Sequence, residues 1–121
     1  MLFRSIVVGS HGARGSRHFY AVALDAAGNV LWTRDEPAAN GIDAYALGAA
    51  LDGSDNAFLC GVAGGGQAVL YGPGGSTAWS YVQPNFTPLA ADVTGAVGRC
   101  LGTTLTSSGS YGVAVLSFPL P

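Results

Sequence analysis

A glycine-rich segment near the start of the sequence has the spacing that comes closest to a cofactor site. Gly9, Gly12 and Gly15 follow a short apolar run, as glycines do where a turn after a strand cradles a phosphate group. Such a site needs a helix over about residues 16–27, whose N-terminus would hold a pyrophosphate, and an acid such as Asp35 further on. The same stretch reads equally well as a strand, and the glycine spacing is wider than the usual Gly-x-Gly. We therefore expect a turn here, with a nucleotide-binding βαβ fragment as an alternative.

Four basic side chains lie in the same segment, namely His11, Arg14, Arg17 and His18. Guanidinium groups bind phosphate or carboxylate with two parallel hydrogen bonds, so this cluster could hold an anion. We favour a solvated surface loop, because loop residues vary freely and face water. The two histidines lie seven residues apart, with no helix to align them and no nearby carboxylate as a third ligand. We therefore expect no metal site here.

Residues 52–56 place several side-chain oxygens in one loop, with the sequence Asp-Gly-Ser-Asp-Asn. Oxygen ligands suit Ca²⁺, but the twelve-residue calcium loop with its bidentate glutamate is absent from the sequence. Asp, Asn, Gly and Ser also serve ordinary turns, so we expect a hairpin turn. Ser10 and Ser54 lie near His or Asp, but no Gly-x-Ser-x-Gly elbow accompanies them. We therefore expect no catalytic residue and no enzymatic activity.

The sequence contains two cysteines, Cys60 and Cys100, which lie 40 residues apart. This number is too small for a disulfide scaffold, and the spacing does not match a zinc site. Both lie in apolar, strand-like stretches, where a free cysteine behaves as a small buried hydrophobic residue. We therefore favour two free thiols, with a single disulfide as the alternative for an oxidising compartment.

The composition of the 121 residues limits the class of protein. Only 5 residues are Lys or Arg and 7 are Asp or Glu, whereas 19 are Gly and 49% are hydrophobic. The hydrophobic content argues against intrinsic disorder, and the scarcity of charge argues against a coiled coil. The few arginines supply no positive field for nucleic acid, and no apolar run reaches the 18 or so residues of a membrane-spanning helix. The composition therefore favours a glycine-punctuated all-β protein.

A repeat organises the chain. Three strand-like runs end at Gly9, Gly61 and Gly102, which are 52 and 41 residues apart, and Trp32 and Trp79 are 47 residues apart. Both tryptophans close a Gly-x-x-x-Trp motif, and Gly, Asn, Asp or Pro residues bound each run. A period near 40–47 residues with four short strands is typical of the blades of WD40-like β-propellers.

Residues 24–32, Leu-Asp-Ala-Ala-Gly-Asn-Val-Leu-Trp, resemble the repeat of quinoprotein-like (PQQ-type) propellers and of related bacterial β-propellers. A second copy over residues 70–79 keeps Gly and Trp but has Tyr71 where the family has Asp. The resemblance implies antiparallel blades, with Trp32 and Trp79 docked between them. It also implies that an enzyme of the family would hold its cofactor with adjacent cysteines, calcium-binding acids and a catalytic Asp. No residue here matches those roles, so we expect no cofactor and no metal.

The repeat divides the chain into units 5–43, 44–86 and 87–121, with three, four and three expected strands. Ten strands are about two and a half blades, whereas closed propellers have about four to eight. We therefore expect an incomplete ring whose open sheets meet the remaining blades of a longer chain or self-associate. On this reading the chain is a fragment, and its N-terminus is truncated.

The expected function is that of a non-catalytic binding or scaffold module, whose ligand or protein partner the sequence does not name. A fragment of a quinoprotein-type enzyme is the alternative. We expect a bacterial envelope or secreted protein, although residues 1–9 contain no signal peptide. Neither nucleic-acid binding nor a membrane span is expected.

Overall fold

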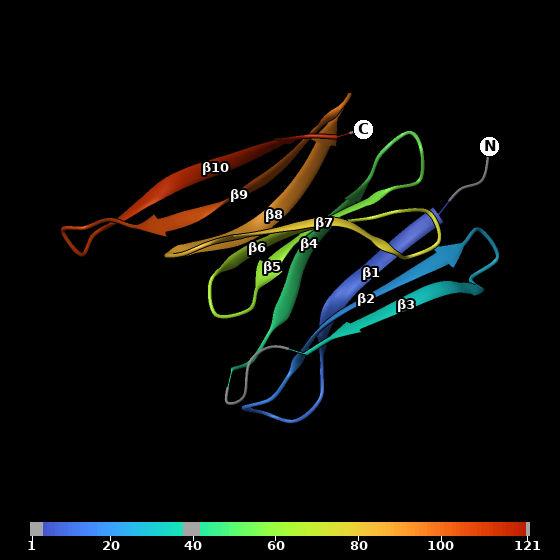
Figure 1. The fold of residues 1–121 in the computed structure, drawn as a ribbon, viewed down its shortest axis with the longest axis horizontal. Helices are drawn as coiled ribbons and strands as arrows, with labels where there is room; N and C mark the ends of the chain where they lie inside the picture. Colours follow the sequence, from blue (N-terminus) through green and yellow to red (C-terminus); the bar gives the residue numbers. More distant parts are fainter. Residues whose placement is uncertain (1–3, 38–41, 121) are drawn as a thin grey trace.

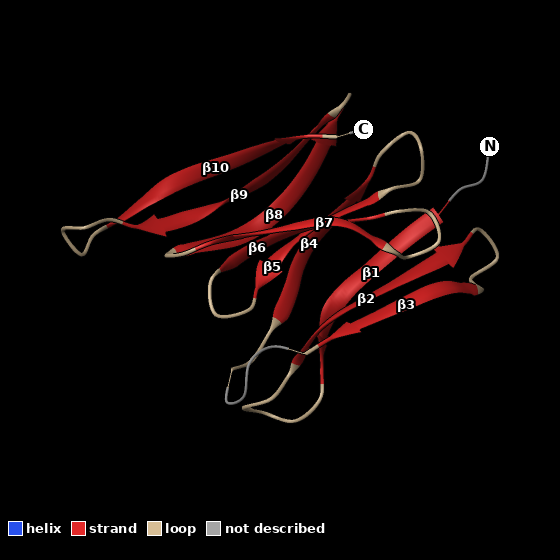
Figure 2. Ribbon diagram, in the orientation of Figure 1, coloured by secondary structure: helices blue, strands red, loops and turns tan. Residues whose placement is uncertain are grey.

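The computed structural model describes residues 4–37 and 42–120, and its regular structure consists entirely of β-strands (Figure 2). The described residues contain ten strands, which form three antiparallel sheets. The strands are β1 Arg4–His11, β2 His18–Asp25, β3 Val30–Glu36, β4 Tyr45–Leu51, β5 Ala57–Val62, β6 Gly66–Tyr71, β7 Thr77–Gln83, β8 Phe86–Thr94, β9 Val97–Leu105 and β10 Tyr111–Pro119. The prediction of an all-β protein is therefore confirmed.

Each sheet is a simple meander, in which strands adjacent in sequence are adjacent in space. The N-terminal sheet has the order β1-β2-β3, the central sheet β4-β5-β6-β7, and the C-terminal sheet β10-β9-β8. The central sheet lies between the other two, as Figure 1 shows. The helix required over residues 16–27 by the βαβ alternative is absent, because His18–Asp25 form β2, which pairs antiparallel with β1. That alternative is therefore wrong.

The burial of each strand follows from its place in this stack. In β10, which lies at one end of the stack, exposed residues alternate with partly buried ones along the strand. In β5, which lies inside the central sheet, five of the six residues are buried. A strand covered on both faces needs apolar residues on both, whereas a strand covered on one face alternates. The central sheet thus contributes to both hydrophobic cores.

Two hydrophobic clusters fill the spaces between the sheets. The first joins the N-terminal and central sheets, and Trp32 packs in it against Tyr71 with ring centroids 5.5 Å apart. The second joins the central and C-terminal sheets, and Trp79 packs there against Phe118 with centroids 5.2 Å apart. Both tryptophans therefore lie between neighbouring sheets.

Four of the hairpin turns share one backbone geometry. In each turn, the first of five residues donates its N–H to the carbonyl of the fifth and accepts an N–H from the fourth. The fourth residue has a positive φ in every case, between 63° and 87°, which favours Gly or a short polar side chain. The turns begin at Asp25, Asp52, Gly72 and Thr106.

Glycine also allows close contact between the sheets. A Cβ atom at Gly48 of β4 would lie 2.6 Å from the backbone N of Ala91 on β8, so any larger residue would force these two strands apart. At Gly75, in the turn between β6 and β7, φ is +86° and a Cβ would lie 2.7 Å from Cγ of Trp32. The packing of the sheets therefore requires glycine at both positions, and the turn also requires it at Gly75.

Candidate functional site

The two histidines of the chain face each other across the hairpin formed by β1 and β2. His11 is the last residue of β1 and His18 the first of β2, and the register of the hairpin pairs them directly. Ile6 and Val8 of β1 pack toward the first hydrophobic cluster. Because side chains alternate between the faces of a strand, His11 lies outside that cluster, on the outer face of the N-terminal sheet.

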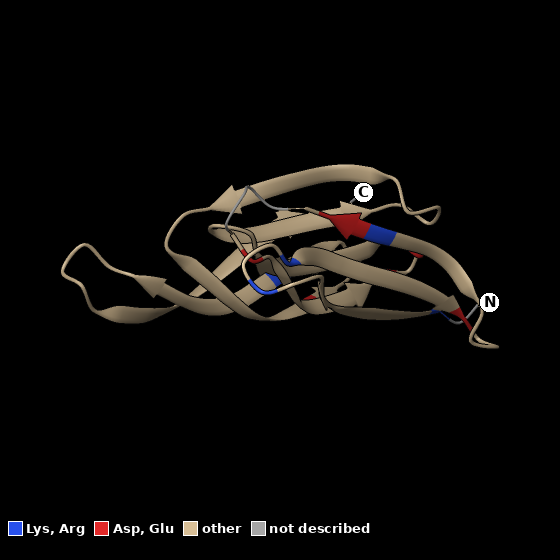
Figure 3. Cartoon of the chain, turned by 90° about the horizontal axis from the view of Figure 1, so that it is seen from below, with Lys and Arg blue, Asp and Glu red and all other residues tan. Residues whose placement is uncertain are grey.

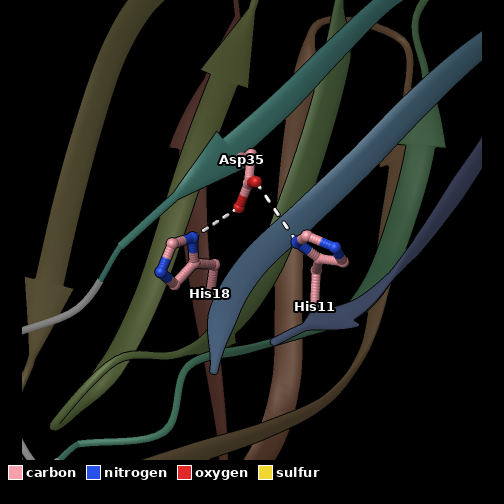
Figure 4. Close-up of side chains that lie close together, drawn as sticks. All are labelled: His11, His18 and Asp35. Atoms are coloured by element: carbon pink, nitrogen blue, oxygen red, sulfur yellow. Dashed lines mark hydrogen bonds and ion pairs between the residues drawn. The ribbon is translucent and has the colours of Figure 1, made fainter. Parts of the chain in front are cut away.

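Asp35 completes the group from the third strand of the same sheet. It pairs with Tyr20 on β2, which places its side chain on the same face as both histidines. Asp35 Oδ1 lies 2.6 Å from His18 Nδ1, and Asp35 Oδ2 lies 3.3 Å from His11 Nδ1 (Figure 4). The ring of Tyr20 packs on that of His11, with centroids 5.2 Å apart. Three strands thus bring two imidazoles and a carboxylate together.

This arrangement overturns the expectation that no carboxylate lies near the histidines. One ligand atom from each of His11, His18 and Asp35 lies within 4.8 Å of the others, a spacing at which the three could hold a metal ion. Asp35 lies 17 residues from His18 in sequence, and only the pairing of β2 with β3 makes them neighbours. The signal that could have found the group is the register of consecutive hairpins, which links residues 11, 18 and 35 on one face.

Arg17, one of the four basic residues of the expected loop, has a partner on β4. The Arg17 side chain lies beside Tyr45, where it donates a hydrogen bond of 3.0 Å to the hydroxyl and stacks over the ring. Gly9, Gly12 and Gly15 belong to the β1–β2 hairpin, and Gly12 and Gly15 have positive φ angles of 113° and 90°. Gly12 and Gly15 therefore shape the loop that connects the two histidines, whereas Gly9 lies within β1.

Asp43 fixes the shape of this loop. Its Oδ1 accepts hydrogen bonds of 2.8 Å from the backbone N–H groups of Gly15 and Arg17. The bond from Arg17, followed by the bond from Gly15 and the nearby arginine charges, outweighs desolvation and lowers the pKa of Asp43 below its usual value. The ionised carboxylate thus fixes the backbone position of Arg17, the residue that immediately precedes His18.

The oxygen-rich loop at residues 52–56 is a hairpin turn, as predicted. Asp52 Oδ1 accepts hydrogen bonds from the backbone N–H groups of Ser54 and Asn56, and its Oδ2 accepts one from the Asn56 side chain. Asp25 and Asn29 make the same contacts in the β2–β3 turn. Hydrogen bonds within the turn therefore occupy the Asp52 carboxylate.

Cys60 and Cys100 form a disulfide, so the prediction of two free thiols is wrong. Cys60 lies on β5 and Cys100 on β9, and their Cα atoms are 5.9 Å apart across the interface between the central and C-terminal sheets. This spacing is near the value most often found in disulfides. The apolar context that suggested free thiols is the second hydrophobic cluster, which places both residues face to face.

A pocket of about 230 Å³ lies between the N-terminal and central sheets. Arg34 forms an ion pair with Glu36 on its wall, and the Arg34 guanidinium also lies 5.1 Å from the centroid of the Tyr71 ring. Burial, with a smaller contribution from the Glu36 charge, raises the pKa of Tyr71 to about 12. Arg34 also donates a hydrogen bond to the carbonyl of Gly75. These polar groups satisfy one another and join the two sheets.

The outer face of the C-terminal sheet is apolar and uncovered toward the far end of the β9–β10 hairpin, whereas the Asp92–Arg99 ion pair lies on the same face nearer the other end of the strands. Tyr111, Val113 and Val115 are 77%, 89% and 50% exposed on the edge strand β10, and Leu101 and Leu105 lie opposite Val115 and Tyr111 on β9. No charged residue follows Arg99 in the sequence, and the far end of the β9–β10 hairpin, at the left of Figure 3, carries no charge. This patch, called the β10 face below, is an exposed apolar surface of the kind that marks interaction sites.

Comparisons with known proteins find structural similarity but no family. No protein-family model matches the chain, and no curated protein matches it. One similar solved structure is a protein of unknown function from Bacteroides caccae, with 13% sequence identity and a TM-score of 0.49. The similarity covers 93% of this chain and 45% of the other, so this chain spans less than half the length of that neighbour.

The described part of the chain contains no helix that could cross a membrane.

Proposed function

We propose that the chain is a segment of β-propeller-type repeats that acts as a non-catalytic binding or scaffold module. The observation that carries this proposal is the β10 face. Along β10, Ala114, Leu116 and Phe118 pack toward the central sheet, whereas Val113 and Val115 point away from it into solvent. Apolar residues on both faces are typical of a strand that is covered on both sides.

The packing within the chain supports one kind of occupant for the β10 face. The central sheet is covered on both faces by antiparallel meanders, through apolar side chains and close contacts between strands. The β10 face presents the same apolar chemistry, so its occupant is a further antiparallel sheet of the same design. For this chain alone in solution, that occupant is a second copy of the chain.

The disulfide supports the proposed location in an envelope or secreted protein. Disulfides persist in oxidising compartments and are rare in cytosolic proteins. The same bond argues against the alternative of a quinoprotein-type enzyme fragment, because Cys60 and Cys100 are not adjacent in sequence and hold two sheets together. No group of described residues supports that activity, so the binding module is the proposal that we retain.

Sedimentation equilibrium over a range of protein concentrations tests the proposal. The wild-type chain is expected to form dimers or larger oligomers, and Val113→Lys is expected to shift it toward the monomer, because a buried lysine would lose its hydration. Val82→Lys is the matched control, since Val82 is 55% exposed on β7, away from the β10 face. A wild-type chain that stays monomeric, or equal effects of both substitutions, would contradict the proposal.

A further inference from the structure

We propose that His11, His18 and Asp35 form a binding site for a divalent transition-metal ion of the zinc type. The site lies on the outer face of the N-terminal sheet, on the opposite side of the stack from the β10 face. It is independent of the self-association proposed above, because it uses different residues on a different sheet. Its side chains are partly accessible, at 62% for His11, 36% for His18 and 39% for Asp35, so an ion can reach them from solvent.

The backbone holds the three donors in fixed relative positions. His11 and His18 are direct partners in the β1–β2 ladder, and Asp35 lies on β3, which pairs with β2. Neighbouring strands are about 4.8 Å apart, so side chains on one face of three adjacent strands converge without any loop having to close. Asp43 shapes the intervening loop through the backbone N–H groups of Gly15 and Arg17.

The distances fit such an ion after a small adjustment. Bonds of about 2.0–2.2 Å in a tetrahedral zinc site place neighbouring ligand atoms about 3.4 Å apart. The distance from His11 Nδ1 to the carboxylate is already 3.3 Å. The distance from His18 Nδ1 to the carboxylate is 2.6 Å, a hydrogen bond that must open to admit the ion. Exposed side chains can make that movement by small rotations.

The donor set determines the class of ion. Two imidazoles and one carboxylate suit Zn²⁺ and similar transition metals, whereas Ca²⁺ and Mg²⁺ prefer sites built from oxygen alone. Three protein ligands leave the remaining coordination position open to water. An ion bound here would join all three strands of the N-terminal sheet and would stabilise the folded chain, because the unfolded chain does not hold the ligands together.

Few other groups in the chain compete for such an ion. The sequence contains two histidines, both of them in this cluster, and two cysteines, both of them in the disulfide. The imidazole ligands are therefore concentrated at one place and no free thiolate of these cysteines competes with them, which makes the test specific.

The experiment is a titration of the chain with Zn²⁺ after treatment with chelator, using protein made without a polyhistidine tag. We expect one strong Zn²⁺ site per chain by calorimetry, and an increase in Tm. His11→Gln and His18→Gln are each expected to weaken binding by at least about tenfold, and Asp35→Asn is expected to weaken it as well. Asp92→Asn is the matched control, because Asp92 is an exposed carboxylate on β8 of another sheet. Circular dichroism checks that each variant is folded.

A second measurement reads the imidazoles directly. Because the chain has two histidines, the ¹⁵N resonances of their rings are easily assigned, and both Nδ1 resonances should shift when Zn²⁺ is added. The proposal is overturned if the wild-type chain binds no Zn²⁺, if the histidine variants bind it as tightly as the wild type, or if the imidazole resonances do not move.

Discussion

Cys60 on β5 and Cys100 on β9 are covalently joined, and their disulfide links the central sheet to the C-terminal sheet. The bond closes a loop of 40 residues, and it lies among the apolar side chains of the second hydrophobic cluster. It therefore reinforces a sheet-to-sheet interface that is also held by the packing of these apolar side chains.

Removal of this disulfide should destabilise the fold. Cross-linking a loop of this length lowers the entropy of the unfolded chain, and its loss is expected to cost about 2 to 4 kcal/mol. Urea unfolding of Cys60→Ala/Cys100→Ala, compared with the wild type in the presence and absence of reductant, measures the effect. The reduced wild type should approach the variant. Two free thiols in the denatured, unreduced wild type would contradict the prediction.

Gly75 should tolerate no side chain, because two separate costs apply there. Its φ of +86° disfavours L-residues, and a Cβ would collide with the indole of Trp32. Gly28 has nearly the same φ, +87°, but open space around it. Gly28→Ala should therefore cost about 1 kcal/mol, from backbone strain alone, and Gly75→Ala clearly more. Thermal unfolding followed by tryptophan fluorescence compares the two, and equal costs would show that the collision is relieved.

Asp52 should stabilise the β4–β5 hairpin. Asp52→Ala removes the acceptor of two backbone N–H groups and of the Asn56 side chain, and it should cost about 1 kcal/mol. Ser54→Ala in the same turn is the control, because the turn uses only the backbone N–H of Ser54. Urea unfolding curves should separate the two variants. A loss in the control as large as that in Asp52→Ala would contradict the assignment.

The contribution of Asp43 to stability should depend on pH. Its lowered folded-state pKa means that, as the pH falls, the unfolded chain takes up the proton first. The stabilisation is therefore fully present above the ordinary carboxyl pKa near 4, and it is lost as the pH falls through the lower value of the folded state. The free energy of unfolding of wild type and Asp43→Ala should differ at neutral pH and converge in acid. A gap that stays constant down to pH 3 would exclude this role.

The sequence by itself determined the local structure of this protein. The strands and their boundaries follow from short-range chemistry. Runs of apolar and β-branched residues form the strands. Gly, Asp or Asn lies between the runs, where a turn needs a positive φ or a side-chain hydrogen-bond acceptor. The Asp25 and Asp52 turns are examples, because all their hydrogen bonds join residues within five positions. The helix over residues 16–27 stayed open as an alternative at the level of the sequence, and only the pairing of β2 with β1 in the structure excluded it.

Only the tertiary structure decided which distant residues meet. Cys60 and Cys100 look like two buried hydrophobic residues until the central and C-terminal sheets face each other and bring their Cα atoms to 5.9 Å. His11, His18 and Asp35 look like unrelated surface residues until two successive hairpins place them on one face. The physical reason is the same in both cases: register and sheet stacking arise from the summed packing of many side chains, and the local sequence around any one residue does not contain that information.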